Sequence, residues 1–329
     1  MAANLVLVVV GLVVLGKGAD VFVLSAARVA RALHLSPVLV GAVVVGFGTG
    51  APELLVSSVA AARGSIDLAA GNVVGSNLAN LTLVLGVGGL LARPETVPRV
   101  IRREAPLSLA TVVLFAALLQ NGLSRREGAV ALAALVVAVA VMVRGARDRP
   151  AAMAAASPAD VAARDEYVHE VVEFVDQDGA APRLRPDVVR LVVGLVATVS
   201  GAQLLVVGAQ RVADDLGLSG GFVGLTVVAI GTSLPELVTA VQAARRNETA
   251  LIAGNVLGSN VFNSTAVAGT AALVGPGVVV DRGLTVVAAL SMVVVAALTW
   301  LFLATSGRLR RWESGLLLAV YLATLPLTS

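Results

Sequence analysis

The sequence predicts an all-α polytopic membrane protein with ten transmembrane helices, arranged as two inverted repeats of five helices each. Three observations lead to this prediction. The chain of 329 residues is 57% hydrophobic and only 14% charged, with a mean hydropathy of +0.92. Its apolar residues gather in stretches long enough to cross a bilayer, and its two halves are similar in sequence. A soluble domain needs far more polar surface than this composition provides.

The composition also excludes several classes of protein. The net charge is only +3, and no basic block carries interleaved aromatic residues, so a nucleic-acid partner is not expected. A soluble enzyme and a disordered chain are disfavoured by the high apolar content. The chain has no cysteine, which excludes disulfides and thiolate metal sites. The expected surroundings are the lipid bilayer.

Ten apolar stretches are expected to form the membrane spans. The first stretch lacks a basic segment before it and a cleavage site after it, so we interpret it as a retained helix rather than a signal peptide. The loops are short except for residues 146–186, which separate five spans from five. The stretches are 4–26, 37–62, 68–92, 105–121, 127–145, 187–210, 219–244, 250–275, 284–305 and 313–328.

The distribution of arginine predicts the orientation in the cell membrane. With these spans, eighteen arginines lie on the side of residues 146–186 and five on the side of the N-terminus. The positive side of a membrane protein is cytoplasmic, so both termini are expected outside the cytoplasm. The cytoplasmic linker 146–186 is acidic near its end, and we favour a solvated connector over a regulatory divalent-cation site because no EF-hand spacing is present.

The two halves of the chain align without a gap at an offset of 183 residues. The segment GNVVGSNLAN (71–80) matches GNVLGSNVFN (254–263) at seven of ten positions. We therefore divide the chain into a first repeat (1–145, core about 40–85), the linker, and a second repeat (187–329, core about 223–268). Because each repeat has an odd number of spans, the second copy is expected to cross the membrane in the opposite direction.

Both repeats place glycine and proline in the middle of an apolar stretch. The segments are GFGTGAPE (46–53) and AIGTSLPE (229–236). Proline removes a backbone donor and glycine tolerates irregular backbone, so a helix break is expected in each. A broken helix at membrane depth is stable only where it is buried or lines a wet cavity. Inverted repeats with such breaks place a substrate site between the two copies.

The deepest acidic residues in the predicted spans are Glu53 and Glu236, which occupy equivalent positions in the two repeats. A carboxylate at the bilayer centre costs at least about 2.5–3.5 kcal/mol, and two together also repel each other. A bound cation relieves both costs, and we favour it over protonated or arginine-paired carboxylates because no arginine lies inside these helices. The pair therefore predicts a cation site of about two positive charges.

Oxygen donors accompany both glutamates at helical spacing, and together they form an all-oxygen set of the kind that Ca²⁺ prefers. Neither histidine is expected near the site, since His34 and His169 fall in or near loops, which disfavours zinc, copper and nickel. No cofactor is expected. The candidate donors are Thr49, Thr232, Ser233, Ser76, Asn80, Ser259 and Asn263, with the carbonyl groups freed at the helix breaks.

Other polar residues in these spans are given structural roles. Asn72 and Asn255 are expected to cap or satisfy backbone groups rather than bind an ion. Asn77 and Asn260 lie off the face shared by Ser76 and Asn80, so helix packing is favoured for them. Ser57, Gln210 and Thr239 suit either an ion path or ordinary hydrogen bonds between helices.

The paired motifs GTGAPE with GSNLAN and GTSLPE with GSNVFN resemble the two α-repeats of the sodium/calcium exchanger family, within the cation/calcium antiporter superfamily. The resemblance covers nearly the whole chain. It implies a secondary antiporter that exchanges Ca²⁺ for Na⁺, with Glu53 and Glu236 as the central carboxylates and the donors above completing the site. It also implies that the carbonyl groups of Gly46 and Ala229 contribute where the helices break.

Two residues depart from the usual family pattern. Gly50 stands where the family usually has serine, and Asn263 stands where many members have aspartate. The predicted pocket therefore has two formal negative charges, which balance one Ca²⁺ or two Na⁺. A Ca²⁺/H⁺ antiporter on the same fold remains an alternative. An intramembrane enzyme that uses the glutamate pair is a remote alternative, because the sequence has no zinc motif and no nucleophile–base pair.

Overall fold

The computed structural model describes residues 2–32, 50–92, 100–147, 184–246 and 249–325. Within these ranges the chain is helical, and the one β-type contact is an isolated bridge between Leu123 and Gly277. This agrees with the predicted all-α class. The linker residues 148–183, with the proposed connector and His169, lie outside the described residues, and so does His34.

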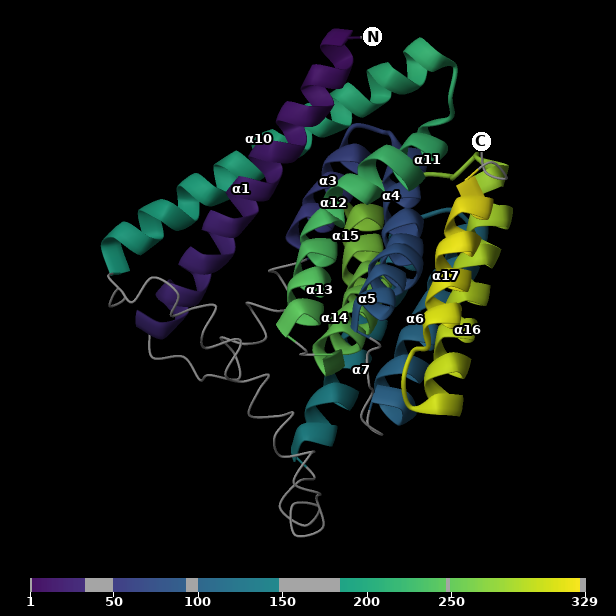
Figure 1. Cartoon of the computed structure of the whole chain (residues 1–329). Helices are drawn as coiled ribbons and strands as arrows, with labels where there is room; N and C mark the ends of the chain where they lie inside the picture. Colours follow the sequence, from purple (N-terminus) through teal and green to yellow (C-terminus); the bar gives the residue numbers. More distant parts are fainter. Residues whose placement is uncertain (1, 33–49, 93–99, 148–183, 247–248, 326–329) are drawn as a thin grey trace.

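The helices follow the order of the predicted stretches, and each stretch overlaps helical residues (Figure 1). Several helices contain a π-helical segment, labelled η. In the first half the elements are α1 (Ala2–Ala32), α3 (Ala51–Ala62), α4 (Ile66–Ala79), η1 (Asn80–Val84), α5 (Leu85–Ala92), η2 (Val100–Glu104), α6 (Ala105–Gln120) and α7 (Arg125–Arg147). In the second half they are α10 (Leu184–Leu216), α11 (Gly220–Val223), η3 (Gly224–Val228), α12 (Ala229–Thr232), α13 (Leu234–Arg246), α14 (Thr249–Phe262), η4 (Asn263–Val267), α15 (Ala268–Val274), η5 (Gly283–Ala288), α16 (Ala289–Ser306) and α17 (Arg311–Thr324).

Five helices within the described ranges are long and apolar enough to cross a membrane, and a sixth is added if the bent pair on either side of Ser233 forms one span. The five are Ala2–Phe22, Ile66–Ala92, Ile101–Gln120, Leu184–Leu216 and Gly283–Thr305. A multi-pass membrane protein is therefore established, whereas ten spans remain a prediction. In the most apolar 18-residue stretch of each helix, 83% is buried for Ile66–Ala92 and 28% for Ala2–Phe22, so Ile66–Ala92 lies in the interior of the bundle.

The π-helical segments repeat at the offset found in the sequence. The segment η1 begins at Asn80 and η4 at Asn263, and η2 begins at Val100 and η5 at Gly283. Both pairs are 183 residues apart. A π-helical turn is rare and occurs frequently at functional sites, so its recurrence at equivalent positions indicates that the two halves share a local structure as well as a sequence.

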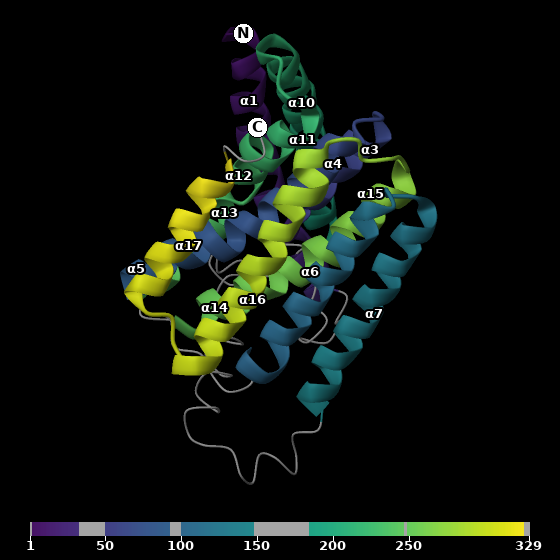
Figure 2. The ribbon, with the colours of Figure 1, turned by 90° about the vertical axis from the view of Figure 1, so that its right-hand side faces the viewer.

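Helices α1 and α10 form a closely packed pair beside the other helices, and α6, α16 and α17 lie on the opposite side of the molecule (Figures 1 and 2). A Cβ atom added at Gly11 would lie 2.5 Å from the backbone nitrogen of Leu205, and one at Gly194 would lie 2.5 Å from that of Phe22. The position in α1 rises as the contacted position in α10 falls, so the two helices run antiparallel. Small residues permit this close approach of two backbones.

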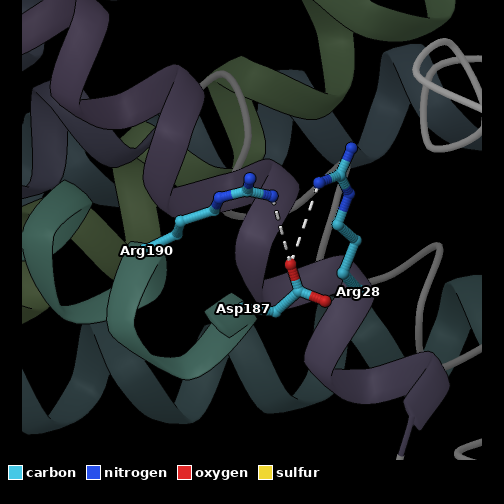
Figure 3. Close-up of polar contacts among 3 residues, drawn as sticks. All are labelled: Arg28, Asp187 and Arg190. Carbon is cyan, nitrogen blue, oxygen red and sulfur yellow. Dashed lines mark ion pairs between the residues drawn. The ribbon is translucent and has the colours of Figure 1, made fainter. Parts of the chain in front are cut away.

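A buried ion pair joins the ends of α1 and α10 (Figure 3). Asp187 and Arg28 are both buried, and a carboxylate oxygen of Asp187 lies 3.8 Å from a guanidinium nitrogen of Arg28. Arg190 approaches the same oxygen at 3.6 Å, but its side chain is 59% exposed. The pair with Arg28 is therefore the one that is protected from solvent screening.

Replacing Asp187 with asparagine is expected to destabilise the protein by about 1–3 kcal/mol, because it removes the negative charge facing the buried Arg28 guanidinium. Thermal unfolding in detergent micelles measures this as a lower melting temperature. The matched control is Arg190→Gln, which removes an exposed partner of the same carboxylate and is expected to change stability by less than about 0.5 kcal/mol. Equal melting temperatures for the two variants would contradict a stabilising role for the buried pair.

Candidate cation site

The helix break predicted in the second repeat is present at Ser233, and its repeat mate Gly50, whose preceding residues lie outside the described ranges, has a similar backbone conformation. The backbone of Gly50 has φ −87° and ψ −2°, and that of its repeat mate Ser233 has φ −87° and ψ 7°. A helix starts directly after each of these two residues, at Ala51 and at Leu234. Proline occupies the second position of both new helices, where its missing N–H group has no helical partner to lose. The second break bends the helix by 42°.

These breaks place Glu53 and Glu236 in the first turn of α3 and α13, in the interior of the protein. Each side chain is 1% exposed. The N-terminal end of a helix carries a partial positive charge, which favours a carboxylate by about 0.3–1 kcal/mol at exposed sites and up to about 2 kcal/mol where it is partly buried. The N-terminal ends of α3 and α13 therefore favour ionised carboxylates at Glu53 and Glu236, although not enough to offset the cost of full burial.

A hydrogen bond connects the two repeats at the breaks. The Ser233 hydroxyl donates to Oε1 of Glu53 over 3.3 Å. Ser233 precedes Glu236 by three residues, so this contact brings the start of α13 to the carboxylate at the start of α3. The predicted grouping of residues from both repeats is present for these side chains.

Buried carboxylates outside this site have evident structural partners. Asp187 forms the ion pair with Arg28, and Glu313 accepts a hydrogen bond of 2.7 Å from the backbone N–H of Arg310 at the start of α17. The second carboxylate oxygen of Glu53, in contrast, has no hydrogen-bond partner among the described residues. A buried acceptor without a donor is costly in the absence of a ligand.

Buried oxygen atoms of α4, η1 and η4 are also left without hydrogen-bond partners. Ser76 Oγ, Asn80 Oδ1 and Asn263 Oδ1 are buried and have no hydrogen-bond partner within the described part of the chain. Asn80 and Asn263 are the first residues of η1 and η4. Ser259 is buried as well. Hard cations such as Ca²⁺ are bound by neutral and charged oxygens of this kind.

The amide nitrogens of the asparagines, unlike their oxygens, are used in bonds between the repeats. Asn80 donates to Oδ1 of Asn260 over 3.2 Å, and Asn260 donates to the carbonyl group of Asn77 over 3.2 Å. Asn77 donates to Ser264 Oγ over 2.9 Å. The packing role expected for Asn77 and Asn260 agrees with these bonds.

Asn72 has a wider role than the backbone capping expected from the sequence. Its amide nitrogen donates to Ser57 Oγ over 2.9 Å and to the carbonyl group of Glu53 over 3.5 Å. Its Oδ1 accepts a hydrogen bond of 3.3 Å from the hydroxyl of Thr232, in the other repeat. The hydroxyl hydrogen of Thr232 is directed toward Asn72 Oδ1 and the carbonyl group of Ala229. The lone pairs of the hydroxyl oxygen are therefore available to a cation. Sequence reasoning missed this bridge, because Asn72 and Thr232 are 160 residues apart.

Three other predicted donors are Gly46, Thr49 and Ala229. Gly46 and Thr49 lie outside the described residues. The carbonyl group of Ala229 is buried and accepts hydrogen bonds from the Ser233 N–H (3.0 Å) and the Thr232 hydroxyl (3.3 Å). To bind a cation, the Ala229 carbonyl oxygen must therefore either coordinate it beside these two hydrogen bonds or lose one of them.

The comparison with known families agrees with this geometry. A family model described as sodium/calcium exchanger protein matches residues 3–144 and 187–328. The chain belongs to the sodium/calcium exchanger family. The two matched segments leave out the linker and cover both halves of the bundle. Several relatives similar to this chain are named as exchangers or antiporters, which supports a cation/Ca²⁺ antiporter.

Two relatives in this exchanger family cover most of the chain. The putative antiporter CaxA of Alkalimonas amylolytica is 35% identical over 85% of this chain and 83% of its own length. The sodium/calcium exchanger MaX1 of Methanosarcina acetivorans is 34% identical over 99% of this chain and 98% of its own length. A solved structure of the sodium-calcium exchanger NCX_Mj, soaked with Na⁺ and Sr²⁺, aligns with a TM-score of 0.58 and 27% identity over 99% of this chain and 98% of that one.

Proposed function

We propose that this protein is a secondary active antiporter that exchanges Ca²⁺ for Na⁺ by alternating access. The observation that carries the proposal is the burial of Glu53 and Glu236 in the first turns of α3 and α13, joined by the Ser233–Glu53 hydrogen bond. Two carboxylates buried in one pocket are stable when cations neutralise them. The names of the relatives, which include a sodium/calcium exchanger, support the same ions.

The proposed ligands fit both ions in alternation. Ca²⁺ and Na⁺ are both bound by hard oxygen donors, and the two formal charges balance one Ca²⁺ or two Na⁺. An empty pocket with two buried carboxylates is too costly to move between the two access states, so exchange rather than leak is expected. The proposed ligands are the side chains of Glu53, Glu236, Thr49, Thr232, Ser233, Ser76, Ser259, Asn80 and Asn263, with the carbonyl groups of Gly46 and Ala229.

We further propose the ten-helix arrangement as two inverted repeats, 1–145 and 187–329, joined by the linker 146–186. Three observations support it: the separate family matches in the two halves, the π-helical segments at an offset of 183 residues, and the antiparallel pair α1 and α10. The arginine distribution supports a cytoplasmic linker and extracytoplasmic termini in the cell membrane.

Purified protein in sealed vesicles is expected to take up radioactive Ca²⁺ when Na⁺-loaded vesicles are diluted into Na⁺-free medium. The physical reason is that Na⁺ leaving down its gradient returns the pocket to the side from which Ca²⁺ enters. Vesicles with equal Na⁺ on both sides and vesicles without protein are the controls. Uptake driven by a proton gradient but not by Na⁺ would overturn sodium coupling in favour of a Ca²⁺/H⁺ antiporter.

A further inference from the structure

The two halves of the cation site differ at one pair of repeat mates. In the second repeat the break residue is Ser233, whose hydroxyl donates to Glu53. In the first repeat the break residue is Gly50, which has the same backbone conformation but no side chain. A Cβ atom added at Gly50 would lie 2.5 Å from two ring atoms of Phe262. The ring therefore occupies the place that a serine at position 50 would take.

The residue that faces Gly50 also differs from its own repeat mate. Phe262 is the last residue of α14 and directly precedes the candidate ligand Asn263. Its repeat mate, 183 positions earlier, is Ala79. One half of the site thus combines glycine with a phenyl ring, and by the repeat relation the other half has a hydroxyl and alanine at the equivalent positions. A ring in place of a hydroxyl removes an oxygen donor and fills space that a hydrated cation needs.

We propose that Phe262 is a specificity-determining residue that limits the pocket to one Ca²⁺ or two monovalent cations. The inference rests on the proposed exchange function and adds a steric cause for the number of ions that the two formal charges balance. By the repeat relation, a hydroxyl at position 50 would face Glu236 as that of Ser233 faces Glu53, and the ring of Phe262 excludes both this hydroxyl and a cation bound to it. The neutral side chains of Asn80 and Asn263 leave Glu53 and Glu236 as the only charged members of the candidate set.

This limit has an electrical consequence. Exchange of one Ca²⁺ for two Na⁺ moves no net charge, so its rate does not depend on the membrane potential. A third Na⁺ in each cycle would move one charge and make the rate depend on potential. The dependence of the exchange rate on membrane potential therefore tests the proposal, because a purely structural role of Phe262 would not change it.

The test measures Na⁺-driven Ca²⁺ uptake into vesicles whose potential is set with K⁺ and valinomycin. Wild type is expected to move two Na⁺ per Ca²⁺ at a rate independent of potential. The double variant Gly50→Ser with Phe262→Ala supplies the missing hydroxyl and the space for it, and is expected to move three Na⁺ per Ca²⁺ with a rate that depends on potential. The matched control Phe262→Leu keeps an apolar side chain of similar reach and is expected to behave as wild type.

The outcomes separate this inference from the function on which it rests. Wild-type exchange that is coupled to Na⁺ but carries charge would overturn the limit set by Phe262 and leave sodium/calcium exchange standing. Wild-type protein that shows no Na⁺-coupled flux would overturn both. The wild-type measurement decides the ion number even where the double variant does not fold, and a double variant that folds, transports and keeps the ratio of two would show that Phe262 does not set it.

Discussion

Exchange is expected to fall to the background of protein-free vesicles when either Glu53 or Glu236 is replaced by glutamine. Each replacement reduces the formal charge of the pocket from two to one, and Ca²⁺ is then bound without full compensation. Removing one partner of a buried charge pair costs about 3–5 kcal/mol, and 1.4 kcal/mol corresponds to a factor of ten. The affinity for Ca²⁺ should therefore fall by at least about two orders of magnitude.

The measurement is Na⁺-driven Ca²⁺ uptake together with Ca²⁺ binding to the purified protein. Asp214→Asn is the matched control, because it removes one carboxylate from an exposed position at the end of α10 and should leave uptake unchanged. Both glutamine variants should remain folded, since the amide keeps the size and one oxygen of the carboxylate. A glutamine variant that binds and transports Ca²⁺ as wild type would refute the site, whichever ion is coupled.

The helix breaks and the acidic pair could be predicted from the sequence because their causes are local. Glycine and proline act on the backbone within one turn, and the break in the second repeat appears at Ser233 as expected, while in the first repeat a helix begins directly after Gly50. The burial of Glu53 and Glu236 follows from their place in apolar stretches. The repeat also helped, because each motif occurs twice at an offset of 183 residues and both copies predict the same local structure.

Contacts between distant segments could not be predicted in the same way. The bridge from Asn72 to Thr232 and the ring of Phe262 against Gly50 depend on how α4, α12, α3 and α14 pack, which hydrophobic periodicity does not specify. The π-helical segments were also not predicted, because a local change in helical register leaves no distinct residue pattern in an apolar stretch. The difference between the repeat mates Gly50 and Ser233 is visible in the sequence. Its consequence could not be predicted, because the sequence does not show that the Phe262 ring contacts Gly50.

A single added methyl group at Gly201 is expected to disrupt the pair formed by α1 and α10. A Cβ atom at this position would lie 2.3 Å from the backbone nitrogen of Leu15 and 2.6 Å from its Cα atom. A backbone cannot rotate aside as a side chain can, so the two helices must separate. Overpacking in a well-packed interior costs about 1–3 kcal/mol, and we expect Gly201→Ala at or above the upper end of this range.

Gly16→Ala is the matched control, because Gly16 belongs to the partner helix α1 and no described atom lies within 4 Å of its added Cβ. Both variants gain about 0.8–1 kcal/mol of helix propensity when glycine becomes alanine, so this contribution cancels in the comparison. Thermal unfolding in detergent should therefore give a lower melting temperature for Gly201→Ala and an unchanged or higher one for Gly16→Ala. Equal melting temperatures would mean that the two helices are not in backbone contact at Gly201. Contacts near the helix ends, such as the Arg28–Asp187 ion pair, would then stabilise the antiparallel pair.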